Sequence, residues 1–155
     1  MKKHLFFILI FSQVSSAQEP KPFKTCNKIV NYTVDDLDLR KNVGLNLAFP
    51  HTNSYYTGGT EMLKKYFLSK TPKLTGTFRT LISFVVNCKG QVGNFEVVLK
   101  NEGVSPTFTN EILEIAKKMP PKWKAATSKE GNPVDSYQVL QFTIVGGRVR
   151  DINYK

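Results

Sequence analysis

The stretch TFRTLISFVVNCKGQVGNFEVVLK, residues 77–100, decides the fold of this chain. Apolar and polar residues alternate on both sides of its central turn, as they do in β-strands. The two faces of the first half are Phe78, Thr80, Ile82, Phe84 and Val86 on one side and Arg79, Leu81, Ser83 and Val85 on the other. Because both faces carry apolar side chains, we predict that this strand lies in the middle of a sheet.

A tight turn at Cys88–Gln91 joins this strand to the next, and Gly90 can adopt the positive φ that such turns use. Residues 92–100 then form the returning strand. Its apolar side chains point one way and its polar side chains the other: Phe95, Val97 and Leu99 against Asn94, Glu96 and Lys100. We therefore predict a hairpin with one face in water.

Helical patterns stand on either side of this hairpin. Before it, Gly58-Gly59 breaks the chain, Thr60 is predicted to cap a helix, and Pro72 ends that helix. After it, Ser105-Pro106 begins a second helix, which Pro120-Pro121 stops. The apolar stripes are Met62, Leu63, Tyr66 and Phe67 in the first helix and Phe108, Ile112, Ile115, Ala116 and Met119 in the second.

A third strand is predicted over residues 136–145, where Leu140, Phe142 and Ile144 alternate with polar residues before Gly146-Gly147. The order helix, strand, strand, helix, strand predicts an α+β domain, with two helices packed on one face of a small antiparallel sheet. A sheet of three strands has two edges with unpaired backbone groups.

The chain divides into four predicted parts. Residues 1–17 are a signal peptide, 18–57 an N-terminal extension that could contain a strand, 58–147 the domain, and 148–155 a short polar tail. The signal has a basic start, an apolar run of about ten residues and small residues before Ala17. That run is too short for a stable membrane span, so we expect cleavage after Ala17 and export to the periplasm. An uncleaved anchor is the alternative.

Cys26 and Cys88 are the two cysteines of the chain, and export to an oxidising compartment predicts a disulfide between them. The net charge is +10. Lysines are densest at the end of the second helix and just after it: Lys117, Lys118, Lys122 and Lys124. This is typical of a solvated face. Contact with an anionic membrane surface stays open, and no nucleic-acid partner is expected.

No catalytic set is apparent in the sequence. His51 is the one histidine outside the signal, in a stretch that reads as a polar loop, and no serine stands in a Gly-x-Ser-x-Gly motif. Asp35, Asp36 and Asp38 lack the glycine and the distal glutamate of a calcium loop. We therefore expect a binding protein without a metal or cofactor, and not an enzyme.

Four segments occur in an order that is typical of one family: Gly58-Gly59 with the helix that follows, the hairpin at Phe84–Val92, Met119–Lys124, and Gly131–Val134 before the third strand. In this order they resemble the C-terminal domain of the TonB energy-transducer family, in the form common in Bacteroidetes-type bacteria. The resemblance covers residues 58–145. No single motif is specific, because glycine hairpins and proline-ended helices are common.

The resemblance implies a function. Domains of this family bind an extended peptide, the TonB box of an outer-membrane transporter, which adds as a strand to the edge of the domain's last strand. The matching residues here are Ser136, Tyr137, Gln138, Val139, Leu140, Gln141, Phe142 and Thr143. The chain departs from a complete transducer because its apolar N-terminal run looks cleavable, so coupling to an inner-membrane motor is not expected.

Two other functions stay open at this stage. The first is an envelope assembly or structural protein that uses the same fold without energy transduction. The second is an electrostatic binder of lipopolysaccharide or nucleic acid, whose affinity would fall steeply with salt. The oligomeric state and the identity of the partner do not follow from the sequence.

Overall fold

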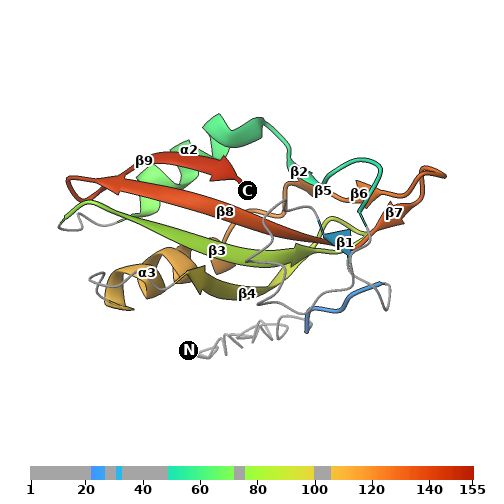
Figure 1. Cartoon of the computed structure of the whole chain (residues 1–155), viewed down its shortest axis with the longest axis horizontal. Helices are drawn as coiled ribbons and strands as arrows, with labels where there is room; N and C mark the ends of the chain where they lie inside the picture. The colour runs from blue at the N-terminus through green and yellow to red at the C-terminus, as the bar shows by residue number, and fades with distance from the viewer. Residues whose placement is uncertain (1–21, 27–30, 33–48, 72–75, 100–105) are drawn as a thin grey trace, which may run out of the picture.

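The computed structural model describes residues 22–26, 31–32, 49–71, 76–99 and 106–155. Its main sheet has five strands (Figure 1). They are β1 (Asn31–Tyr32), β3 (Phe78–Val86), β4 (Val92–Leu99), β8 (Ser136–Val145) and β9 (Arg148–Tyr154). The order is β1-β8-β3-β4, and β9 also pairs with β8. All pairs are antiparallel except β1 with β8, which is parallel.

The predicted hairpin forms, and its first strand is central as expected. β3 lies between β4 and β8, and its register with β8 runs without a shift from Phe78 opposite Ile144 to Val86 opposite Ser136. Gly90 has a φ of 74° in the turn. A Cβ at this position would overlap the backbone carbonyl oxygen of Trp123. Glycine is therefore required here for its conformation and for the close approach of the two backbones.

Two helices, α2 (Gly59–Lys70) and α3 (Pro106–Lys117), pack on the same face of the sheet, which confirms the α+β prediction. They also contact each other, because the Tyr66 hydroxyl lies 3.1 Å from the carbonyl oxygen of Ile115 and 2.8 Å from that of Lys118. The core beneath them is aromatic and aliphatic, with its largest fully buried side chains at Tyr56, Phe67, Phe84, Phe142, Leu63, Ile82, Ile112, Leu140, Ile144 and Ile152.

The start of α2 differs from the prediction. Its N-cap is Gly58, with a φ of 100° and no side-chain cap, so Thr60 lies inside the first turn. The end of the helix is closed by Thr71, whose hydroxyl donates to the carbonyl oxygen of Phe67 at 2.7 Å. Pro106 is the first residue of α3, as predicted. Pro72 and Ser105 fall outside the described residues.

The prediction of a polar tail over 148–155 is wrong, because these residues form β9. Gly146 and Gly147 both have positive φ and turn the chain back along β8. Val149 and Ile152 are both 2% exposed although they are three residues apart, because the register with β8 shifts between Thr143 and Ile144. This shift interrupts the period-two pattern, and the stretch is short and rich in arginine, so it resembles a tail.

Short strand pairs, which the sequence did not indicate, lie beside the main sheet (Figure 1). β2 (Tyr55–Tyr56) pairs with β5 (Trp123–Lys124), and β6 (Ala126–Thr127) pairs with β7 (Pro133–Val134). Strands of two residues carry too little periodicity to be read from a sequence. Together they position Trp123 against the core.

The face of the sheet opposite the helices is also apolar. Leu81, Val85, Tyr137 and Val139 form a second buried cluster there, with Phe23 and Val98 partly buried against it. Both faces of β3 and β8 are therefore packed, as the apolar pattern of β3 predicts. Neither described helix has the length and hydropathy needed to span a membrane.

Candidate functional site

The predicted peptide-binding strand is β8, and its outer edge is not vacant. β3 pairs along one side of β8. On the other side, β9 pairs with it from Leu140 to Val145 and β1 pairs with Ser136 and Tyr137. The expectation that this strand is the last one and has a free edge is therefore wrong, because residues that the sequence assigned to the extension and the tail occupy that edge.

The eight residues predicted to contact a peptide are mostly inside the protein. Six of them are buried: Ser136, Tyr137, Gln138, Val139, Leu140 and Phe142. Gln141 and Thr143 are partly exposed. The Ser136 hydroxyl lies 2.9 Å from that of Ser54, which is also buried. A direct role of these side chains in binding stays a prediction, and it requires the covering strands to move.

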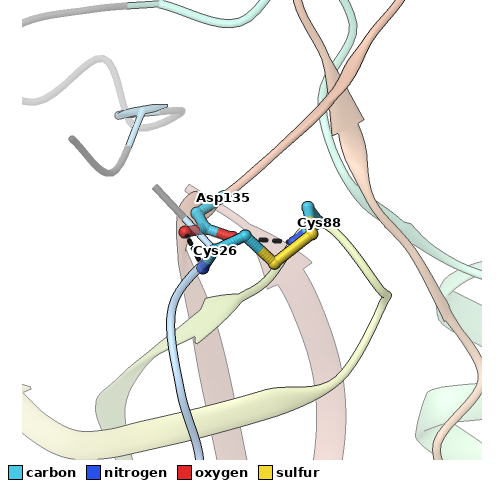
Figure 2. A group of neighbouring side chains, drawn as sticks. All are labelled: Cys26, Cys88 and Asp135. Carbon is cyan, nitrogen blue, oxygen red and sulfur yellow. Dashed lines mark hydrogen bonds between the residues drawn. A yellow bond between two sulfur atoms is a disulfide. The ribbon is translucent and has the colours of Figure 1, made fainter. Parts of the chain in front are cut away.

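The segment before β1 is fixed to the sheet by a covalent bond. Cys26 and Cys88 form a disulfide across 62 residues of sequence, as predicted (Figure 2). Cys88 lies in the β3–β4 turn, so the disulfide joins the N-terminal segment to the end of the hairpin. A crosslink over a loop of this length stabilises a protein by about 4 kcal/mol through the entropy of the unfolded chain.

Asp135 lies directly beside this disulfide and is fully buried (Figure 2). Its Oδ2 accepts a hydrogen bond of 2.6 Å from the backbone N–H of Cys26, and its Oδ1 accepts one of 2.7 Å from that of Cys88. One carboxylate thus holds the backbone of both bridged residues. A buried carboxylate needs such donors, because burying a charge without partners is costly.

Asn87 makes a second polar clamp one residue before Cys88. Its Nδ2 donates to the carbonyl oxygen of Lys24 and to Oε1 of Gln91, both at 2.9 Å. Its Oδ1 accepts from the backbone N–H of Lys89 and of Gln91. The side chain therefore shapes the hairpin turn and holds the N-terminal segment to it with the same amide group.

Within the described part of the main sheet, three strands pair on one side only, and one of them, β1, has just two residues. β9 pairs with β8 alone, and β4 pairs with β3 alone. Near the turn, β4 is irregular: Asn94 has a φ of 52°, and the register with β3 shifts between Ser83 and Val85. The ring of Phe23 also lies against Gly93. Bulges of this kind hinder the addition of a further strand. β9 has one register shift with β8, between Thr143 and Ile144, whereas β4 has two with β3 and also contacts Phe23, so β9 is the more suitable edge.

An aromatic cluster fixes the end of β9. The ring of Trp123 makes edge contacts with Tyr56, Phe84 and Tyr154, with centroids 5.5, 5.0 and 6.1 Å away. The Tyr154 hydroxyl accepts a hydrogen bond of 3.2 Å from the backbone N–H of Tyr56. Burial raises the pKa of the Tyr154 phenol above its usual value, and the hydrogen bond from Tyr56 opposes this shift. Burial also raises the pKa values of Tyr56 and Tyr66.

Candidate ligands for a metal come together at one place among the described residues: the sulfurs of Cys26 and Cys88 and the carboxylate of Asp135. The disulfide occupies both sulfurs, and thiolates are the form that binds metal. His51 is exposed, as predicted. Asp35, Asp36 and Asp38 fall outside the described residues. The absence of an enzymatic activity stays a prediction.

Sequence reasoning missed Asp135, the strand β9 and the role of Asn87. The roles of Asp135 and Asn87 depend on contacts between residues far apart in the chain, such as Asp135 with Cys26 over 109 positions. The signal that could have found β9 is the double glycine at Gly146-Gly147, followed closely by the apolar residues Val149 and Ile152.

Comparison of the chain with protein-family models, with curated proteins and with solved structures found no match.

Proposed function

We propose that this protein is an exported binding module of TonB C-terminal type, which takes an extended peptide of an outer-membrane transporter or of another envelope protein as an added strand. The observation that carries the proposal is the position of β9 at the edge of the main sheet, paired on its inner side by β8. A strand edge offers backbone donors and acceptors to a guest peptide; these backbone hydrogen bonds give affinity, and contacts with alternate side chains give specificity.

The outer edge of β9 is the docking surface in this proposal, in place of the covered edge of β8. β9 is firmly attached to the protein, because Val149 and Ile152 are 2% exposed and Tyr154 contacts Trp123. Displacing it would expose this apolar surface to water. The side chains that alternate with the buried ones, Arg148, Arg150 and Asn153, are exposed and available to select a partner.

Export supports this function in two ways. The signal-like N-terminus predicts delivery to the periplasm, and the disulfide is of the kind that persists in an oxidising compartment. The four sequence segments that resemble the TonB family lie in α2, in the β3–β4 hairpin, in the stretch from the end of α3 through β5, and in the connection before β8.

The test is a titration of labelled peptides from the N-termini of TonB-dependent transporters, followed by N-methylation of the peptide at one residue at a time. A strand that pairs with an edge uses the N–H of alternate residues. We therefore expect saturable binding of the unmodified peptide. N-methylation should abolish this binding at every second residue and leave it intact at the residues between. Amide hydrogen exchange in the complex should slow in β9 and stay unchanged in β4.

Two results would contradict the proposal. If no transporter peptide binds, the TonB-type function is wrong. If a peptide binds but protects β4, or protects neither strand, the assigned surface is wrong.

An envelope assembly or structural protein with the same fold is the second candidate. It is favoured by the pairing of β8 on both sides, because β1 and β9 cover the edge that the family uses. Crosslinking in the envelope separates the two: a structural protein would be captured with partners that lack a TonB box, and its β9 amides would exchange alike with and without transporter peptides.

A further inference from the structure

An open cavity of about 800 Å³ lies where three parts of the chain meet. Its walls come from the start of α2, the β3–β4 turn, and the segment around β5. No residue of β9 lines it. The cavity is within the size range of small-molecule sites, and it is separate from the strand edge proposed above for peptides.

The charged residues that line this cavity are all basic. They are Lys89 from the hairpin turn and Lys122 and Lys124 on either side of Trp123, and all three are exposed. No aspartate or glutamate is among the lining residues. The three ammonium groups therefore lack an acidic partner in the cavity wall, which favours an anionic ligand.

The start of α2 adds to this positive potential. Gly58, the N-cap of the helix, lines the cavity and no side chain caps the first turn. The free N–H groups at a helix start carry partial positive charge and bind anions. Glu61 is the acidic residue of this first turn, and it is not part of the cavity wall.

The remaining wall is apolar and fixed in position. Met62 is 44% exposed, which is unusual for a large apolar side chain on a helix whose neighbour Leu63 is fully buried. Trp123 is 5% exposed and held by its aromatic neighbours, and its Nε1–H has no hydrogen-bond partner among the described residues. This part of the wall suits the non-ionic portion of a ligand, and the buried Trp123 Nε1–H is not accessible to it.

We propose that this cavity binds a phosphate group, with the rest of the ligand against Met62 and Trp123. Lysine ammonium groups and a helix start suit phosphate, because they surround a compact anion with several oxygens without requiring a planar fork. Arginine, the residue that pairs best with planar carboxylates, does not line the cavity. The phosphate could belong to a soluble sugar phosphate or to the headgroup of a phosphorylated lipid.

The test uses the purified protein with its disulfide formed and two probes. One probe is a monosaccharide 1-phosphate, measured by calorimetry against the same sugar without phosphate. The other is vesicles of zwitterionic lipid with and without a phosphorylated glycolipid, measured by co-sedimentation. Saturable binding of the sugar phosphate assigns a soluble ligand, and binding of the glycolipid vesicles alone assigns a headgroup.

Two triple variants decide whether the cavity is the site. K89Q/K122Q/K124Q removes the three cavity lysines, and K65Q/K129Q/K155Q removes three exposed lysines outside the cavity wall, so that both lose the same charge. We expect affinity to fall roughly a hundredfold in the first variant and less than about threefold in the second. An equal loss in both variants, or the absence of binding to either probe, would overturn the proposal. Peptide binding at β9 should not change in the first variant, so the two functions are tested separately.

Discussion

Oδ1 of the buried Asp135 carboxylate accepts a hydrogen bond of 2.7 Å from the backbone N–H of Cys88. The other oxygen accepts one from Cys26, so Asp135→Ala removes the acceptor of two partly buried backbone N–H groups. We expect the free energy of unfolding to fall by about 3–5 kcal/mol, since losing a partner of a charged, buried group costs more than losing a neutral one. Urea denaturation under oxidising conditions measures this loss.

Asp151→Ala is the matched control. Asp151 accepts bonds from the backbone N–H of Ile152 and from Nδ2 of Asn153, but it is partly exposed, so water can replace it. We expect a loss below about 1 kcal/mol. Equal losses in the two variants would contradict a special role of Asp135.

Reduction of the disulfide should lower the free energy of unfolding by about 4 kcal/mol, because the bond closes a loop between residues 62 apart. The measurement is denaturation with and without a phosphine reductant. The variant C26S/C88S should be as unstable as the reduced protein and should not respond to the reductant. If reduction leaves the midpoint unchanged, the N-terminal segment does not contribute to the stability of the domain.

Gly90→Ala tests the contact between the hairpin turn and β5. The substitution adds a Cβ that overlaps the Trp123 carbonyl oxygen, at a backbone position with a φ of 74°. We expect a loss of about 2–5 kcal/mol, which combines backbone strain and overpacking. Gly131→Ala has the same kind of φ, 81°, with open space around the added Cβ, so it should lose only about 1–2 kcal/mol. Thermal unfolding of the two variants separates the stability lost to steric overlap from the stability lost to backbone strain. Similar losses in both variants would show that Trp123 can move aside.

The stability of the protein should fall at high pH because of Tyr154. Burial raises the pKa of its phenol in the folded state. The unfolded state therefore ionises first, and the stabilising difference that exists below a pH of about 10 is lost as the pH rises through the folded pKa. Spectroscopic titration of the phenol together with unfolding curves across this range measures the effect.

Tyr154→Phe should remove part of this pH dependence and lower the free energy of unfolding at neutral pH by about 1 kcal/mol, since the N–H of Tyr56 loses its acceptor. Tyr56 and Tyr66 also have raised pKa values, so the variant should retain the rest of the dependence. An unchanged profile in the variant would show that Tyr154 does not contribute.

The local elements could be predicted because their signals are local. The alternation in β3 gives its central position and both of its packed faces, and the stripe in residues 106–117 gives α3. The disulfide followed from two cysteines and a signal-like N-terminus. The helix start at Gly58 could not be predicted. A glycine with positive φ can replace a side-chain cap, and in the sequence it looks like an ordinary chain break.

The pairing of β8 could not be predicted for a different reason. Its own sequence is equally consistent with an edge and with an internal strand. The decision depends on whether β1 and β9 reach it. β1 has two residues and is distant from β8 in the sequence, and β9 follows β8 directly but its pattern is interrupted by a register shift. The same holds for the lysines of the cavity, which come from two separate turns and meet only in the folded protein.

The position of the Cys26–Cys88 bond has a consequence for oxidative folding. The chain has two cysteines, so no scrambled intramolecular isomer exists and an isomerase has nothing to correct. The competing product is a covalent dimer, whose yield rises with concentration. The hydrogen bonds of Asp135 and Asn87 to this segment act against it wherever they form before oxidation, because they raise the effective concentration of one thiol at the other.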